Sequence, residues 1–226
     1  MTSCKLVTFY FDVISPYNYF GFEGITRHRG VWKTPVALKP FFFAGVLRAS
    51  KNETVPLKVP IKEQYLHKDV VFNAQYWGLP FRLPKDLTNT MLTTSSIVPQ
   101  RVLVACQLES EALMEDVAKH LWRRYFAYGK SAYTERDVEE VLRDRRVANV
   151  DDIMKASKSD EVKSILRRNT DEAIAQGCFG APWTHITDGD GKVLQAVFGA
   201  DRLPQIADFI DEKFHGPMRE KADRHL

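Results

Sequence analysis

Cysteine is scarce in this chain, which has three cysteines among 226 residues. Cys4, Cys106 and Cys178 lie far apart, and no two of them have the C-x-x-C spacing of a redox motif or a zinc site. Three separated thiols predict neither a disulfide framework nor a metal centre, and they favour a reducing compartment. The six histidines also lack the H-x-x-x-H spacing of helical metal ligands. The sequence therefore predicts no bound metal.

Strong charge and long apolar runs are also missing. The chain has 32 basic and 29 acidic residues, a formal net charge of +3, which is too even to indicate a nucleic-acid partner. No uninterrupted apolar run approaches the ~20 residues that cross a bilayer, so no membrane insertion is expected. With 44% hydrophobic residues over this length, the chain can bury a full core.

An apolar, β-prone segment at residues 6–11 is followed by Ser15 and Pro16. Serine is favoured as a helix N-cap and proline at the first helical position, so the segment predicts a strand that leads into a helix at Pro16. The free N–H groups at that helix start and the Ser15 hydroxyl would then meet at one place, which suits an anion such as a thiolate. The alternative is that Ser15 serves only as the helix cap.

A second group of signals lies in the C-terminal part of the chain. Pro182 precedes a β-prone segment, and an Ala-Pro bond at such a position is a candidate cis peptide. A turn at 188–191, a strand at 192–198 and a helix opened by residues 199–202 follow. Strand, helix and strand, then proline, hairpin and helix, is the order of a thioredoxin-like α/β fold.

The two halves of this order are separated by a long segment with helical periodicity. Apolar residues recur every four positions over 113–125, and shorter stripes follow at 138–142 and 162–166. We therefore expect a thioredoxin-like fold interrupted by an all-helical insertion domain. The predicted division is 1–60 for the first thioredoxin-like half, 61–176 for the insertion and 177–226 for the second half.

The start of the first helix also excludes one activity of this fold. Thioredoxin-fold oxidoreductases have Cys-x-x-Cys there, whereas this chain has Ser15 and Asn18 at the two positions. Thiol–disulfide exchange needs a protein thiolate at that point. A dithiol oxidoreductase is therefore not expected.

Three motifs, taken in order, resemble those of the kappa-class glutathione transferases: FDVISPY at 11–17, FGAP at 179–182 and FGADR at 198–202. The resemblance spans nearly the whole chain and extends to the 2-hydroxychromene-2-carboxylate isomerases and to thioredoxin-like disulfide oxidoreductases with a helical insertion. It implies a homodimeric detoxification enzyme that uses glutathione as co-substrate, conjugates it to small electrophiles and also reduces peroxides.

The resemblance also implies which residues hold glutathione. Ser15 would be the catalytic residue, and the backbone of Ala181 would pair with the cysteinyl part of the tripeptide. Asp201 would hold the γ-glutamyl ammonium, with helix capping as its alternative role. The full set of implied binding residues is Ser15, Pro16, Tyr17, Asn52, Lys62, Ala181, Pro182, Ala200, Asp201 and Arg202.

Ala200 stands where the family often has serine, so one hydroxyl contact to the γ-glutamyl carboxylate is missing, although the backbone N–H remains. Asn52 and Lys62 resemble the residues that contact the glycyl end. They flank a segment that reads as a loop.

Two other functions fit the same residues. One is a glutathione-dependent isomerase of the 2-hydroxychromene-2-carboxylate type, and the other is a non-catalytic thioredoxin-fold binding protein. Kappa enzymes imply a mitochondrial or peroxisomal location, with the cytosol as the alternative. Residues 1–5 lead directly into the first strand, so no cleavable leader is expected. The final Arg224-His225-Leu226 is related to a Ser-Lys-Leu peroxisomal signal but lacks its small first residue.

Overall fold

The computed structural model describes residues 5–53 and 55–219 of the chain. Residues 1–4, which include Cys4, lie outside these ranges, and so does the C-terminal tripeptide 224–226. The predictions that concern them therefore fall outside the described residues. Four strands form one mixed sheet in the order β2-β1-β3-β4. They are β1 (Leu6–Phe11), β2 (Val36–Pro40), β3 (Trp183–Thr187) and β4 (Val193–Phe198). Strand β1 pairs in parallel with β2 and antiparallel with β3, which pairs antiparallel with β4.

The described residues form ten α-helices and two short 3₁₀ helices. They are α1 (Pro16–Arg29), α2 (Phe43–Ser50), η1 (Pro56–Lys58), α3 (Pro60–Trp77), α4 (Leu87–Thr93), α5 (Ile97–Glu109), α6 (Glu111–Phe126), α7 (Glu135–Asp144), α8 (Val150–Ala156), α9 (Asp160–Ala175), η2 (Ala200–Arg202) and α10 (Leu203–Phe209). No helix in the described ranges combines the length and the apolar character needed to cross a membrane.

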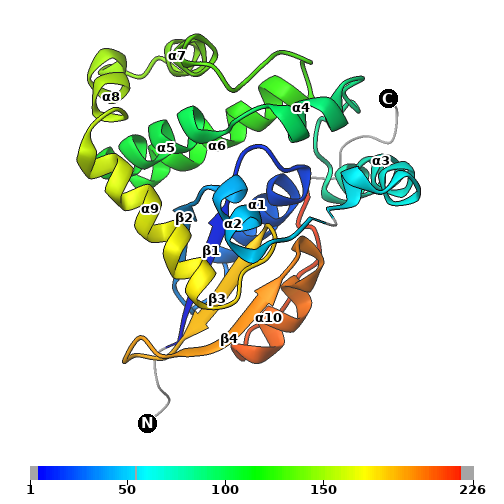
Figure 1. The fold of residues 1–226 in the computed structure, drawn as a ribbon. Helices are drawn as coiled ribbons and strands as arrows, with labels where there is room; N and C mark the ends of the chain where they lie inside the picture. The colour runs from blue at the N-terminus through cyan, green and yellow to red at the C-terminus, as the bar shows by residue number, and fades with distance from the viewer. Residues whose placement is uncertain (1–4, 54, 220–226) are drawn as a thin grey trace.

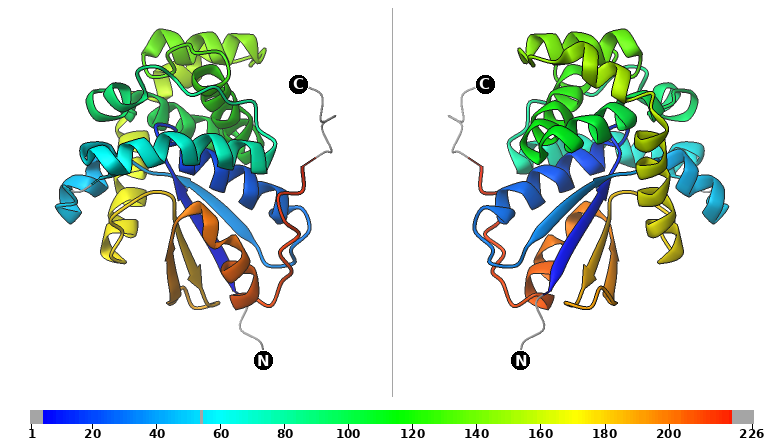
Figure 2. Two further views of the ribbon diagram at one scale, coloured as in Figure 1. Left: turned by 90° about the vertical axis from the view of Figure 1, so that its right-hand side faces the viewer. Right: turned by 90° about the vertical axis from the view of Figure 1, so that its left-hand side faces the viewer.

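The predicted fold class is confirmed. The elements β1, α1 and β2 come before a long run of helices, and β3, β4 and α10 come after it. Figure 1 shows α4 to α8 gathered at one end of the sheet, and in both views of Figure 2 α10 lies at the opposite end of the molecule. The thioredoxin-like elements thus surround a helical insertion in sequence, while the insertion covers one end of the sheet in space.

Helix α1 lies at the centre of this arrangement and is buried along most of its length. Its Tyr19 ring stacks on Trp122 of α6 at 5.3 Å between centroids, and both side chains are fully buried. A Cβ on Gly24 would lie 2.3 Å from Leu203 and 2.7 Å from Trp77, so only glycine permits α1 to pack this closely. Residues of the sheet, α1 and the insertion consequently share one apolar cluster.

Two segments differ from the sequence-based expectation. From the largely apolar residues at 36–43 we expect a second strand over that range, but β2 ends at Pro40, and the Phe43 N–H donates to the Asp12 carboxylate where α2 begins. The segment before Lys62, expected to be a loop, contains η1 and the start of α3. Pro56 and Pro60 occupy the first turn of these two helices, where a missing N–H costs nothing.

Candidate active site

The structure places Ser15 as the N-cap of α1. The residue is 3% exposed, and its Oγ accepts a hydrogen bond from the Asn18 N–H at 3.4 Å. Among the described residues, no acceptor is found for the Ser15 hydroxyl hydrogen. Capping therefore uses a lone pair of Oγ and leaves its proton available to an anion. The two roles expected for Ser15 are compatible.

Asp12, which no sequence signal assigned to the site, fixes the loop that leads to Ser15. Its fully buried carboxylate accepts hydrogen bonds from the Ile14 N–H (3.0 Å), the Phe43 N–H (2.9 Å) and the Ser96 hydroxyl (2.7 Å). Burial raises the pKa of Asp12 to about 6, although the three donors favour the charged form. One carboxylate thus joins the start of α1, the start of α2 and the residue before α5.

Gln100 of α5 is a second anchor for the same loop. Its Nε2 donates to the carbonyl oxygens of Phe11 and Phe41, both at 2.8 Å, and its Oε1 accepts from the Val13 N–H at 3.2 Å. Gln100 is fully buried, so these bonds are shielded from water. The insertion therefore holds the backbone that positions Ser15.

A cleft of about 720 Å³ opens beside the start of α1, next to α3, the loop before β3 and η2. Ile61, Tyr65 and Phe72 of α3 form its apolar wall. Six of the predicted binding residues line it, namely Tyr17, Lys62, Ala181, Pro182, Ala200 and Asp201. The structure thus brings together residues from the first helix, the insertion and the second thioredoxin-like half.

A hydrogen bond from Tyr17 to Asp69 connects α1 with α3 at this cleft. The Tyr17 hydroxyl donates to Asp69 Oδ2 at 2.6 Å, and Asp69 also accepts from Asn73 at 3.1 Å and from Tyr65 at 3.3 Å. Burial and the Asp69 carboxylate raise the pKa of Tyr17, so its hydroxyl stays protonated. Asp69 was not predicted, although its i,i+4 spacing from Tyr65 and Asn73 on one helix face was a usable signal.

The Ala181-Pro182 bond is cis, as predicted. The Pro182 carbonyl accepts from the Gly199 N–H at 3.1 Å, which joins the loop before β3 to the end of β4. Among the described residues, no hydrogen bond uses the backbone of Ala181. An unpaired backbone segment that lines a cleft can add an extended peptide in the manner of a β-strand.

Asp201 in η2 is 67% exposed and accepts a hydrogen bond from Arg202 Nη1 at 2.9 Å. No side chain caps the start of η2, so the capping role considered for Asp201 is not observed. An exposed ion pair of this kind contributes little to stability, and a ligand ammonium can exchange into it readily. Asp201 is thus available to a cation in the cleft.

Four predicted residues are not among those that line the cleft. Ser15 and Pro16 are buried at the start of α1 next to Tyr17, and Arg202 pairs with Asp201. Asn52 follows α2, and its Nδ2 donates to the Phe179 carbonyl at 2.9 Å. Its amide is therefore already engaged in holding the loop before β3.

The cysteines give no alternative nucleophile in the described part of the chain. Cys106 and Cys178 are free and buried, and burial raises the pKa of each thiol to about 12. Across residues 5–53 and 55–219, no three His, Cys, Asp or Glu side chains gather as metal ligands. Neither of these two described cysteines is therefore a source of a thiolate at Ser15.

Comparisons with known proteins identify the family of the chain. Residues 6–211 match the DsbA-like thioredoxin domain. The chain is 68% identical over 221 residues to glutathione S-transferase kappa 2 of Caenorhabditis elegans, with 98% of each chain covered. It is 29% identical over 224 residues to glutathione S-transferase kappa 1 of Rattus norvegicus, again with 98% of each covered.

Among solved structures, a 2-hydroxychromene-2-carboxylate isomerase matches with a TM-score of 0.73 at 18% identity, covering 91% of this chain and 94% of that one. The cytosolic disulfide reductase DsbM of Pseudomonas aeruginosa matches with a TM-score of 0.64 at 16% identity, covering 91% and 95%. At these identities the two matches bear on the fold alone.

Proposed function

Since the chain belongs to the kappa class of glutathione S-transferases, it is an enzyme that uses glutathione, and we propose that Ser15 stabilises the glutathione thiolate at the start of α1. The observation that carries this proposal is the Ser15 hydroxyl, which caps the helix through a lone pair and keeps its proton. Ser15 donates to the thiolate and forms no covalent bond with substrate. The thiolate is the nucleophile.

The helix N-terminus and the Ser15 hydroxyl together supply enough free energy to ionise the thiol of bound glutathione at neutral pH. A free thiol has a pKa near 8.5, and lowering it by one unit takes about 1.4 kcal/mol of preference for the anion. A helix N-terminus contributes about 0.3–2 kcal/mol, and a hydroxyl donor to a charged acceptor about 1.5–3 kcal/mol. Together they lower the thiol pKa by roughly two units, which makes bound glutathione mostly thiolate at neutral pH.

The cleft supports a single orientation for the tripeptide. The cysteinyl backbone pairs with the free backbone of Ala181, and this places the sulfur toward Ser15. The γ-glutamyl ammonium binds the Asp201 carboxylate, and its carboxylate receives the Ala200 N–H. The exposed Lys62 ammonium lies on α3, where it can bind the glycyl carboxylate.

The apolar wall formed by Ile61, Tyr65 and Phe72 suits a small electrophile. In conjugation, the thiolate sulfur bonds to the electrophilic carbon and the leaving group departs with its electron pair. With a peroxide, the thiolate takes one oxygen to give the sulfenate and an alcohol, and a second glutathione then forms the disulfide and water.

Ultraviolet titration of the bound thiolate tests the role of Ser15. In Ser15→Ala the helix N-terminus remains and the hydroxyl is lost, so the apparent thiol pKa should rise by about one to two units. Ser50→Ala is the matched control, because Ser50 is exposed at the end of α2. An unchanged pKa in Ser15→Ala would reduce Ser15 to a helix cap.

The isomerase alternative uses the same thiolate, which adds to a double bond, permits rotation and is then expelled. Turnover of a halodinitrobenzene supports conjugation, whereas turnover of a chromene carboxylate without it supports isomerisation. This assay distinguishes the two reactions by the substrate that is turned over. Both reactions use the same thiolate, so the role of Ser15 is tested only by the titration.

We also propose the homodimer and the organelle location that the family resemblance implies. Four large side chains of α3, Ile61, Tyr65, Phe72 and Tyr76, are 41–71% exposed on one helix, which supports association of two copies. Sedimentation of Phe72→Glu against wild type tests the dimer. A fluorescent fusion that keeps the C-terminus free, compared with one lacking the last three residues, tests peroxisomal import.

A further inference from the structure

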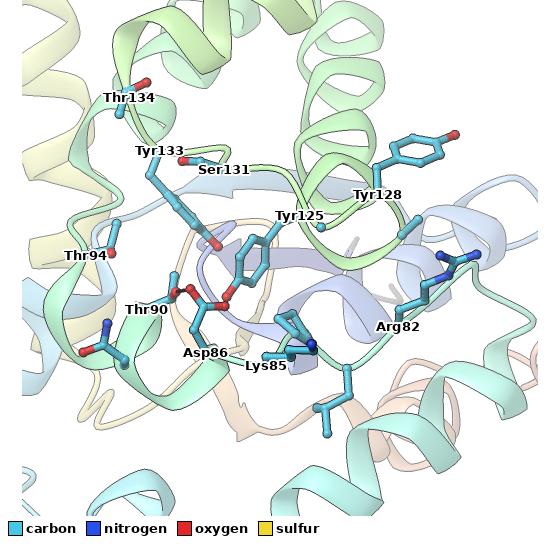
Figure 3. A pocket seen from close by; sticks show the side chains of 15 residues that line it. Arg82, Lys85, Asp86, Thr90, Thr94, Tyr125, Tyr128, Ser131, Tyr133 and Thr134 are labelled. Atoms are coloured by element: carbon cyan, nitrogen blue, oxygen red, sulfur yellow. Dashed lines mark hydrogen bonds between the residues drawn. The ribbon is translucent and has the colours of Figure 1, made fainter.

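The helical insertion contains a second cleft, of about 710 Å³, that the proposed transferase chemistry does not use. It lies between the loop at 82–86, helix α4, the end of α6 and the loop at 127–134 (Figure 3). We call it the insertion cleft. Its lining shares no residue with the cleft beside the start of α1, in which we propose that glutathione binds.

Two tyrosine hydroxyls in the insertion cleft have no hydrogen-bond partner in the described structure. Tyr125 and Tyr133 are 6% and 5% exposed, their rings meet edge to face at 5.4 Å, and both hydroxyl oxygens are buried. Figure 3 shows both hydroxyls directed toward Asp86 and Thr90. The Tyr125 hydroxyl lies near Thr90 but outside hydrogen-bond geometry. Buried hydroxyls are normally paired, so two unpaired ones in one cleft indicate a ligand that completes them.

The charges around the cleft favour an anionic ligand. Arg82 and Lys85 line it, and neither forms an ion pair with a described residue. Asp86 accepts the Thr90 hydroxyl at 3.1 Å. Two cations stand against one carboxylate among the lining residues, while the buried Asp12 carboxylate also acts on Tyr133, so an anion is favoured on the side of the cleft where Lys85 lies. Burial raises the pKa of Tyr125 and Tyr133, so both remain protonated and can donate to it.

The mouth of the cleft is apolar. Leu83 and Pro84 line the cleft on the 82–86 loop, and Leu83 is 38% exposed. A planar ring can stack against such a surface. The anionic group would then point inward, toward the tyrosine hydroxyls.

The loop that carries Tyr133 is held in place before any ligand arrives. Asp137 accepts hydrogen bonds from the Ser131 hydroxyl (2.6 Å), the Tyr133 N–H (3.2 Å) and the Thr134 N–H (2.9 Å). These bonds fix the backbone on both sides of the Tyr133 side chain. A site whose donors are already oriented loses little entropy on binding.

We propose that the insertion cleft is a second ligand site, which binds a small organic monocarboxylate with a planar ring. The carboxylate accepts hydrogen bonds from Tyr125 and Tyr133 near Lys85, and the ring lies against Leu83 and Pro84. The proposal does not depend on glutathione binding. Its test therefore leaves glutathione out.

The probe pair is 4-nitrobenzoate and the neutral 4-nitrobenzamide, which has nearly the same shape. Calorimetric titration of the full chain should show binding of the benzoate that is at least roughly tenfold tighter than that of the amide, because only the benzoate offers a charged acceptor. Equal affinities, or no binding of either compound at millimolar concentration, would overturn the proposal and leave a cleft filled by water.

The double variant Tyr125→Phe with Tyr133→Phe locates the binding. It should weaken benzoate binding by roughly tenfold or more, while the melting temperature stays the same or rises, because the removed hydroxyls have no hydrogen-bond partner in the part of the chain that the structure describes. Tyr76→Phe, at an exposed tyrosine on α3, is the matched control. Lys85→Gln should also weaken binding, whereas Lys155→Gln on α8 should not. Benzoate affinity unchanged in the double variant would place the binding elsewhere and refute the proposal.

Discussion

Asp12 holds the loop before Ser15 and Asp137 holds the loop of Tyr133, each by accepting three or more hydrogen bonds, yet the pKa values of the two aspartates shift in opposite directions. Burial raises the pKa of Asp12 to about 6 against its three donors. At Asp137 burial also acts to raise the pKa, but hydrogen bonds from Ser131, Thr134 and Tyr133 outweigh it and lower the value to about 2. Asp137 also pairs with the Arg124 guanidinium at 3.3 Å, so lesser burial and a positively charged neighbour together account for the opposite sign.

This difference shows what each carboxylate can do for its loop. The partly exposed Asp137 stabilises the insertion at neutral pH, because its charge is solvated as well as hydrogen-bonded. The fully buried Asp12 carries a charge at some cost, and its function is to fix the position of Ser15 relative to α2 and α5. The loop before Ser15 is thus held at a cost in stability, whereas the loop of Tyr133 is held without that cost.

The largest predicted effect comes from removing the buried aspartate. Asp12→Ala leaves two backbone N–H groups and the Ser96 hydroxyl without an acceptor in a site closed to water. At about 1–3 kcal/mol for each, the free energy of unfolding should fall by at least about 3 kcal/mol. Urea denaturation measures it, with Asp208→Ala at an exposed aspartate of α10 as the control.

A milder variant keeps this prediction testable if Asp12→Ala fails to fold. Ser96→Ala removes one donor of the three and should cost about 1–2 kcal/mol. It should also raise the pKa of the bound glutathione thiol, since the loop before Ser15 loosens. A loss of stability with an unchanged thiol pKa would make Asp12 a structural residue without influence on Ser15.

Local signals explain how much of the molecule could be predicted. Ser15-Pro16 and Ala181-Pro182 mark the starts of α1 and β3, and helical periodicity marks the insertion, because caps, prolines and amphipathic faces act over a few residues. The hydrogen bonds that hold the site together could not be predicted in this way. Asp12 meets Phe43 and Ser96 across 31 and 84 positions of sequence, and Tyr17 meets Asp69 across 52. Only the folded chain brings these partners together.

The opposite pKa shifts predict opposite pH dependences. The folded-state pKa of Asp12 lies above the ordinary 3.8, so its stabilising contribution is complete below that value and is lost as pH rises through about 6. The folded-state pKa of Asp137 lies below 3.8, so its contribution is complete above that value and is lost as pH falls through about 2.

Asparagine variants measure the two contributions separately. The destabilisation caused by Asp12→Asn should shrink by about 3 kcal/mol as pH rises from about 4 to 7. That caused by Asp137→Asn should shrink by about 2 kcal/mol as pH falls from about 4 to 2. Urea unfolding across this range is the measurement. Curves of the same sign would show that burial does not separate the two sites.

The smallest effect on stability is expected at a third aspartate, Asp201, which does not hold a loop in the described structure. Asp201 is exposed and, among the described residues, its one ion pair is with the neighbouring Arg202, so Asp201→Asn should leave the melting temperature almost unchanged. The γ-glutamyl ammonium loses its counter-charge in this variant, and glutathione affinity should fall by roughly 10- to 100-fold. Asp208→Asn supplies the control for charge alone. Thermal unfolding and calorimetric titration decide the outcome, because a lowered melting temperature with unchanged affinity would give Asp201 a structural role like that of Asp12 and would leave the γ-glutamyl group without a binding residue.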